Sequence, residues 1–257
     1  MYLDGLQKWE KLWSMEFHPQ KCQVLHLSNK RNEIISKYFI HQQELQAVDN
    51  IKYLGVTINN KLSWNNHINN ICAKANMTLN FLFRNFKGAS RRAKEQLYKS
   101  YVRPTLEYAN TVWDPHTKLN IDKLESVQRR AARFCTSVTS RDERVTPLLC
   151  DLQWEPLSSE RRAKSKVFTW FKAKTNLIDV KLPDLGPSQR LTRSNNDYQI
   201  PFCRTNAYKY SFFPSSAGLW NSIPPTVRSS SSLASFQTAL GSFTLRHKYE
   251  CGVPSLD

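Results

Sequence analysis

Several features that mark common classes of protein are missing from this sequence. No apolar run approaches the roughly 18 residues that a membrane-spanning helix needs, so we expect no membrane span. The six cysteines are scattered, and they form no C-x-x-C pair and no Cys/His cluster with zinc spacing. This pattern favours reduced thiols in an intracellular protein. The N-terminus has no charged start followed by an apolar stretch, so we also expect no signal peptide.

Recognisable catalytic motifs are missing as well. The sequence has no glycine-rich phosphate loop, no G-x-S-x-G motif and no H-E-x-x-H motif. Acidic residues are sparse, and no Asp-Asp or D-x-D pair occurs. Because two-metal phosphoryl transfer needs clustered carboxylates to hold Mg²⁺, the residues present predict no metal site.

Positive charge is plentiful and unevenly distributed. The 257 residues carry 37 Lys and Arg against 21 Asp and Glu, a formal net charge of +16. Residues 66–135 hold thirteen Lys/Arg and five Asp/Glu, a net +8, so half of the excess lies in this one block. Such a cluster favours a polyanionic partner, most often nucleic acid. The alternative is a generally basic surface that faces water.

Local patterns near the N-terminus predict a small α+β unit. Apolar residues at three- and four-residue spacing predict a helix at about 3–15, and strands are predicted at 21–27, 36–41 and 51–58. The last strand carries the sharpest signal, because its residues alternate with the two-residue period of a half-buried strand. The isolated Gly55 inside it suggests a bulge or the close approach of another backbone. On one face lie Leu54, Val56 and Ile58, and on the other Tyr53 and Thr57.

The next seventy residues have helical periodicity. We predict a helix from about 66 to 86, a second one that Ser90 caps and Arg91 begins, and a kink or restart at Pro104. The helix at about 120–135 separates its residues best, and its basic face predicts contact with phosphates or, alternatively, a solvated surface. Its apolar arc is Ile121, Leu124, Val127, Ala131 and Phe134, and its polar arc is Lys123, Ser126, Arg129, Arg130 and Arg133.

The C-terminal part is less regular. A basic helix is predicted at 160–174 and a terminal helix at about 232–245. Periodicity is lost over 176–218, where we expect short strands and loops, and 219–225 is expected to form a rigid turn. The tyrosines and the tryptophan between 98 and 113 can stack on bases or belong to the core: Tyr98, Tyr101, Tyr108 and Trp113.

An ordered series of short motifs runs through nearly the whole chain. Its members are Leu6–Trp9, Trp13–Phe17, Lys21–Cys22, Tyr53–Ile58, Leu62–Trp64, His67–Ile68, Tyr101–Ala109, Val112–Pro115, Leu124–Phe134, Phe213–Pro214 and Trp220–Pro224. The series resembles the C-terminal part of the reverse transcriptases of non-LTR retrotransposons, of the jockey and CR1-like kind. His18 stands where that family usually has asparagine, which is a modest departure.

The resemblance implies a fold and a division of the chain. It implies an α+β fold in which residues 1–65 form a small antiparallel palm remnant with a primer-grip strand. Residues 66–135 would form a helical thumb that tracks the template–primer duplex, and residues 136–257 an irregular C-terminal region.

The resemblance also implies roles for particular residues. Tyr53-Leu54-Gly55 matches the primer-grip hairpin, which holds the 3′ end of the primer. Lys21 matches the family's lysine and is a candidate general acid for the leaving pyrophosphate, although a lysine at a strand end is often only exposed. Nucleic-acid contacts would fall to Arg91, Arg92, Lys123, Arg129, Arg130 and Arg133.

The intact enzyme, by this resemblance, copies RNA into DNA with Mg²⁺ and dNTPs at a nick in target DNA. Its partners would be an RNA template and DNA primer duplex, with a nuclear location and no membrane partner. The metal-binding aspartates, the fingers and most of the palm would lie upstream of Met1. We therefore expect this fragment to bind no cofactor or metal and to be inactive alone. The alternative is a non-catalytic nucleic-acid-binding protein derived from such an element.

Overall fold

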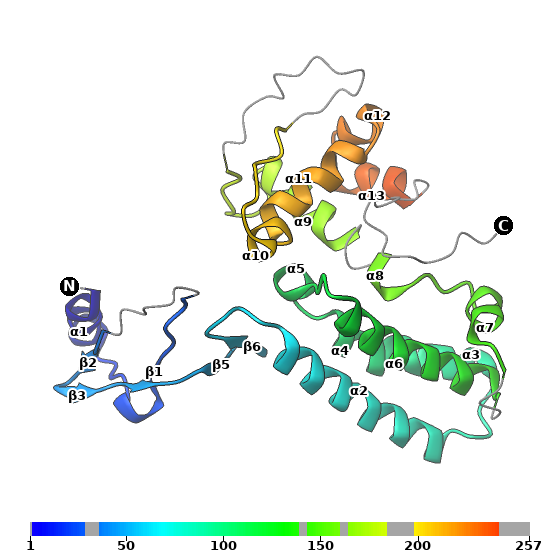
Figure 1. Cartoon of the computed structure of the whole chain (residues 1–257), viewed down its shortest axis with the longest axis horizontal. Helices are drawn as coiled ribbons and strands as arrows, with labels where there is room; N and C mark the ends of the chain where they lie inside the picture. Colours follow the sequence, from blue (N-terminus) through cyan, green and yellow to red (C-terminus); the bar gives the residue numbers. More distant parts are fainter. Residues whose placement is uncertain (1, 29–35, 139–142, 160–163, 184–197, 242–257) are drawn as a thin grey trace. The chain divides into compact units, whose positions relative to one another are not determined.

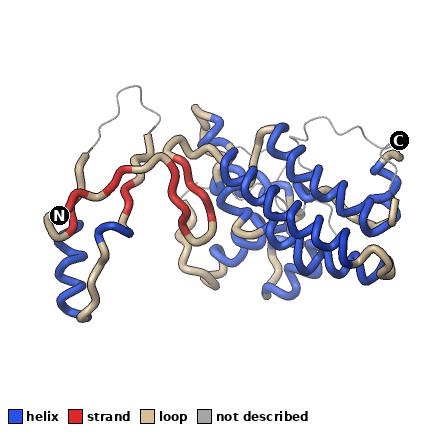
Figure 2. Tube along the Cα trace, turned by 90° about the horizontal axis from the view of Figure 1, so that it is seen from below, coloured by secondary structure: helices blue, strands red, loops and turns tan. Residues whose placement is uncertain are grey.

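The computed structural model describes residues 2–28, 36–138, 143–159, 164–183 and 198–241. The chain forms two compact units, Met1–Asn70 and Ile71–Asp257, and the boundary falls inside the long helix α2 (Asn65–Asn85). All strands of the described residues belong to the first unit, and the described part of the second unit contains helices and loops (Figures 1 and 2). The predicted α+β fold with a mainly helical region is confirmed. The predicted divisions after residues 65 and 135 remain predictions.

The described residues of the first unit form helix α1, three short ladders and the start of α2. Gln23–Val24 pairs in parallel with Gln46–Ala47, whereas the other two ladders are antiparallel. The strand predicted at 21–27 is thus only two residues long in the structure. The elements are α1 (Tyr2–Trp13), the 3-10 turn η1 (Pro19–Lys21), β1 (Gln23–Val24), β2 (Phe39–Ile40), β3 (Gln43–Glu44), β4 (Gln46–Ala47), β5 (Asn50–Tyr53) and β6 (Val56–Asn59).

The single strand predicted at 51–58 is wrong, because the segment folds back on itself as a hairpin. Tyr53 pairs with Val56, and Leu54 and Gly55 form the turn with φ angles of 45° and 84°. Two positive φ angles define the primed turn whose twist matches that of two antiparallel strands. The glycine therefore serves the turn and does not mark a bulge.

In the second unit, α2 is followed by several short helices and the long helix α6. The predicted cap is present, since Ser90 Oγ accepts from the Ala93 N–H at 3.3 Å. Pro104 lacks an N–H, and the chain passes through a π turn before the helix resumes. The elements after α2 are α3 (Arg91–Leu97), η2 (Tyr98–Val102), α4 (Arg103–Glu107), α5 (Asn110–Trp113), α6 (Lys118–Thr136), α7 (Val145–Asp151) and α8 (Leu157–Ser159).

The remaining helices have an aromatic core of their own. Phe171 and Phe236 stack at 4.2 Å, and Trp220 lies 5.8 Å from Phe236. Residues 160–163 and 242–245 of the two predicted helices lie outside the described residues. The elements are α9 (Lys166–Lys174), α10 (Asn206–Lys209), α11 (Phe212–Ser222), α12 (Pro225–Arg228) and α13 (Leu233–Gly241).

Helix α11 overturns two predictions for this region. Strands and loops were expected over 176–218 and a rigid turn over 219–225, but α11 replaces the end of the first stretch and the start of the second. Pro214 is tolerated because it lies in the first turn, where its missing N–H has no helical partner. Leu219 and Trp220 are buried, so packing stabilises a helix whose local sequence indicates a break.

The described helices include none that is both long and apolar enough to cross a membrane. The five cysteines in the described ranges are free thiols, and burial raises the pKa of Cys135 to about 12.

Candidate nucleic-acid interface

The hairpin tip presents apolar side chains to solvent. Tyr53 is 63% exposed and Leu54 is 72% exposed. A leucine at φ 45° is unusual, because its Cβ is crowded in the left-handed region, and asparagine or glycine normally fills this position. An unfavourable backbone conformation at an exposed apolar tip is the kind of feature that points to function.

The hairpin is held by the start of helix α2. The Thr57 backbone N–H donates to His67 Nδ1 at 3.2 Å, and Asn66 Nδ2 donates to Asn50 Oδ1 at 3.0 Å. His67 is buried, and burial lowers its pKa, which favours the neutral ring; the bond from the Thr57 N–H makes Nδ1 the acceptor of that ring. Sequence reasoning gave His67 no role of its own; its place eight residues after the end of the hairpin was the available signal.

Lys21 lies at the end of the 3-10 turn η1 and is exposed. Cys22 separates it from β1, so Lys21 does not start the strand. The structure therefore leaves its predicted role as a general acid untested.

The basic face of α6 is largely engaged with other parts of the protein. Arg130 donates to Asn76 at 3.0 Å and to Asn80, and its guanidinium lies 5.7 Å from the Phe83 ring. Arg133 donates to the Glu143 carbonyl at 3.2 Å. The remaining two predicted contacts on α6 are Arg129, which donates to the Asp122 carbonyl at 3.4 Å, and Lys123, which is half-buried.

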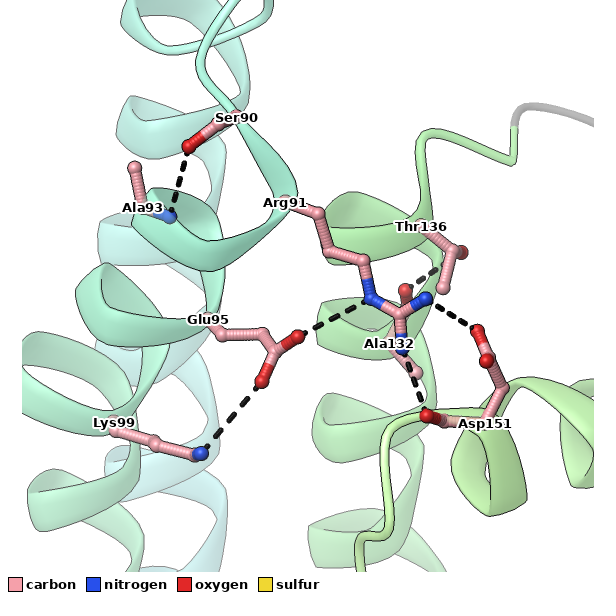
Figure 3. Close-up of polar contacts among 8 residues, drawn as sticks. All are labelled: Ser90, Arg91, Ala93, Glu95, Lys99, Ala132, Thr136 and Asp151. Atoms are coloured by element: carbon pink, nitrogen blue, oxygen red, sulfur yellow. Dashed lines mark hydrogen bonds and ion pairs between the residues drawn. The ribbon is translucent and has the colours of Figure 1, made fainter.

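Arg91 is also committed to partners inside the protein. It lies 2.7 Å from Asp151 and 3.2 Å from Glu95, so it joins α3 to α7 (Figure 3). The hydrogen bond with Asp151 raises the pKa of Arg91, so the residue stays charged, but two carboxylates compensate its charge. Its neighbour Arg92 is exposed and has no hydrogen bond or ion pair within the described part of the chain.

The outer face of α2 carries exposed apolar side chains flanked by exposed cations, a feature that sequence reasoning missed. Met77 is 65% exposed and Phe81 is 53% exposed, and Lys74 and Arg84 are exposed one turn before and after them. Neither cation forms a side-chain hydrogen bond or ion pair with the described residues. We call these four residues the α2 stripe. The spacing of three, four and three residues was the available signal, but it was masked by the stronger apolar stripe on the buried side.

The four aromatic candidates divide into two pairs. Tyr98 and Trp113 are buried, and burial raises the pKa of Tyr98, whose hydroxyl donates to Gln128 at 3.1 Å. Tyr101 and Tyr108 are exposed by 63% and 58%. Only the second pair is therefore placed to stack on a ligand.

Comparison with known proteins finds relatives for part of the chain. No family model and no solved structure matches the chain. The chain is 27% identical over 141 residues to the RNA-directed DNA polymerase from the mobile element jockey of Drosophila melanogaster, covering 51% of this chain and 15% of that protein. It is 30% identical over 143 residues to the probable RNA-directed DNA polymerase from transposon BS of the same fly, covering 52% and 15%. About half of this chain is homologous to the polymerases of non-LTR retrotransposons.

A third relative extends the match. The RNA-directed DNA polymerase from the jockey element of Drosophila funebris is 24% identical over 170 residues, which covers 65% of this chain. The chain spans only 15–18% of the length of these three polymerases. The similarity therefore concerns only a small part of each of these polymerases.

The Mg²⁺ expected for an intact polymerase needs a cluster of carboxylates. Within residues 2–28, 36–138, 143–159, 164–183 and 198–241, no group of three or more His, Cys, Asp or Glu side chains is placed to hold a metal ion. These residues do not fit such a site, and we assign no catalytic step to them.

Proposed function

We propose that this chain binds a template–primer duplex as the primer-grip and thumb part of a non-LTR reverse transcriptase, without metal-binding aspartates of its own. The homology with RNA-directed DNA polymerases over about half of the chain carries the proposal. The exposed hairpin tip and the concentration of positive charge in residues 66–135 support it. A nuclear location is part of the proposal, because the family primes on chromosomal DNA.

The α2 stripe is the surface that suits a duplex best. Lys74 and Arg84 are ten residues apart, which is about 15 Å along a helix at 1.5 Å per residue. Cations with this spacing reach separate phosphates, while Met77 and Phe81 between them contact sugars. We propose that the duplex lies along this stripe, with the hairpin tip Tyr53-Leu54-Gly55 as the primer grip.

Salt-dependent binding tests the proposal. The probe is a fluorescent DNA primer annealed to an RNA template, and its anisotropy is measured with increasing chain at several salt concentrations. We expect the affinity to fall steeply with salt, with a slope of about −0.9 for each phosphate contact, and no primer extension with Mg²⁺ and dNTPs. The absence of binding, or binding that ignores salt, contradicts the proposal.

The non-catalytic alternative also predicts duplex binding by this chain. In-frame translation of the DNA upstream of the coding sequence distinguishes the two. An Ala-Asp-Asp turn encoded within a few dozen codons favours the polymerase, and a stop codon directly upstream favours the separate binding protein.

A further inference from the structure

The seven residues Asn110–His116 form a joint between two groups of helices in the second unit. On one side lie α2 to α6, and on the other lies the aromatic cluster of α9 to α13. Three side chains of this joint reach the second group. Asp114 Oδ2 lies 3.1 Å from Lys166 Nζ, Asn110 Nδ2 donates to Ser165 Oγ at 3.2 Å, and the His116 and Tyr210 rings stack at 4.4 Å.

The ion pair at the centre of this joint is buried. The side chains of Lys166 and Asp114 are 5% and 4% exposed. Lys166 Nζ has a second oxygen partner, Ser215 Oγ on α11, at 3.1 Å. One ammonium group thus links the segment after α5 with both α9 and α11. Asp114 and Lys166 are 52 residues apart in the sequence, so local sequence patterns could not predict that they form a pair.

A buried ion pair is a poor source of net stability. Removing both charges from water costs about as much as their attraction returns, whereas leaving one of them alone in the interior is strongly unfavourable. An arrangement of the helices that buries the Asp114 carboxylate or the Lys166 ammonium away from its partner is therefore energetically unfavourable. An apolar contact in its place has no such directional requirement, because apolar side chains pack in several orientations.

We propose that the Asp114–Lys166 pair sets the orientation of the α9–α13 cluster relative to the α2–α6 helices. Asp114 and Lys166 are positioning residues, since they contact each other, Lys166 also donates to Ser215, and this role needs no ligand. The cluster has its own aromatic core, which joins α9, α11 and α13 without the Asp114 carboxylate. The proposal is independent of nucleic-acid binding.

Distance measurements between the two groups of helices test the proposal. Nitroxides are attached to p-acetylphenylalanine at Leu119 on α6 and at Gln237 on α13, both exposed, which leaves the native cysteines unlabelled. Pulsed EPR then gives the distribution of distances in the full chain. We expect one narrow distribution in the parent protein and a broad one in D114N, with a thermal midpoint lower by about 6–20 °C.

A double variant separates orientation from stability. In D114L/K166M both charges are replaced by apolar groups, and we expect the thermal midpoint to return to that of the parent while the distribution stays broad. The control E107Q breaks the half-exposed Arg103–Glu107 pair within one helix and leaves the distribution narrow. A narrow distribution in D114L/K166M, or in D114N, overturns the proposal, because the other contacts then set the orientation.

Discussion

At position 54, a leucine is unfavourable for folding, and the proposed function explains its presence. Its left-handed backbone costs about 1–2 kcal/mol relative to an ordinary conformation, and its side chain is 72% exposed, so folding gains little from leucine here. Strain of this kind persists where another demand outweighs it. In the proposed primer grip, that demand is apolar contact with the primer end.

We predict that L54N raises stability and weakens binding at the same time. Asparagine adopts the left-handed conformation more readily, so the hairpin should gain up to about 1 kcal/mol in chemical denaturation. Affinity for the primer–template should fall, as measured by anisotropy.

Leu62 supplies the matched control. It also has a positive φ, 55°, and is 44% exposed, but it lies outside the hairpin. L62N should therefore gain stability with no loss of affinity. If L54N binds as tightly as the parent, the apolar tip does not contact the primer.

At the scale of elements, α2 and α6 differ in how their cations are used. Arg130 and Arg133 on α6 donate to groups on α2 and in the segment before α7, whereas Lys74 and Arg84 on α2 have no such partners among the described residues. A guanidinium that already satisfies protein acceptors must give up those bonds to reach a phosphate. We therefore expect α2 to supply more of the duplex contact than α6.

Replacing the two cations of the α2 stripe tests this expectation. K74Q/R84Q should make the dependence of log affinity on log salt shallower by about 1–2, since each phosphate contact contributes about 0.9. R91Q is the matched control, because two carboxylates compensate Arg91, and it should leave the slope unchanged.

The triple variant R129Q/R130Q/R133Q removes the cations of α6, and it should lower the slope less than K74Q/R84Q. A larger effect of the triple variant would assign the duplex to α6.

At the scale of the whole molecule, the two units differ in the contacts that stabilise their folded state. Within residues 2–28 and 36–70, the first unit has three two-stranded ladders and few buried apolar residues, among them Ile40, Leu45, Val56 and Ile68. Its helix α1 is attached by a polar residue, Glu10, whose carboxylate accepts from the Phe17 N–H and lies 2.9 Å from His41 Nε2. The Phe17 N–H is the main cause of the lowered pKa of Glu10.

We predict that the first unit opens before the second. Short ladders with little burial have low local stability, whereas α6 is buried along one whole face. Native-state hydrogen exchange should give lower opening free energies for the amides of β5 and β6 than for those of α6, and urea should unfold the chain in two steps. A single transition with equal protection in both units would contradict this prediction.

Much of the helical architecture was determined by local sequence. The caps and the periodic apolar positions predicted α2, α3 and α6 because a helix is built from contacts three and four residues apart. The balance of charge and the ordered motifs likewise needed no structure: the charge indicated a nucleic-acid partner, and the motifs indicated a resemblance to a polymerase.

Only the tertiary structure decided features whose partners are distant in sequence. It turned the strand at 51–58 into a hairpin, formed α11 in spite of Pro214, and paired Asp114 with Lys166. It also showed which cations of the basic block are engaged and which face solvent. The physical reason is the same in each case: packing and desolvation depend on neighbours that the chain brings together only when it folds.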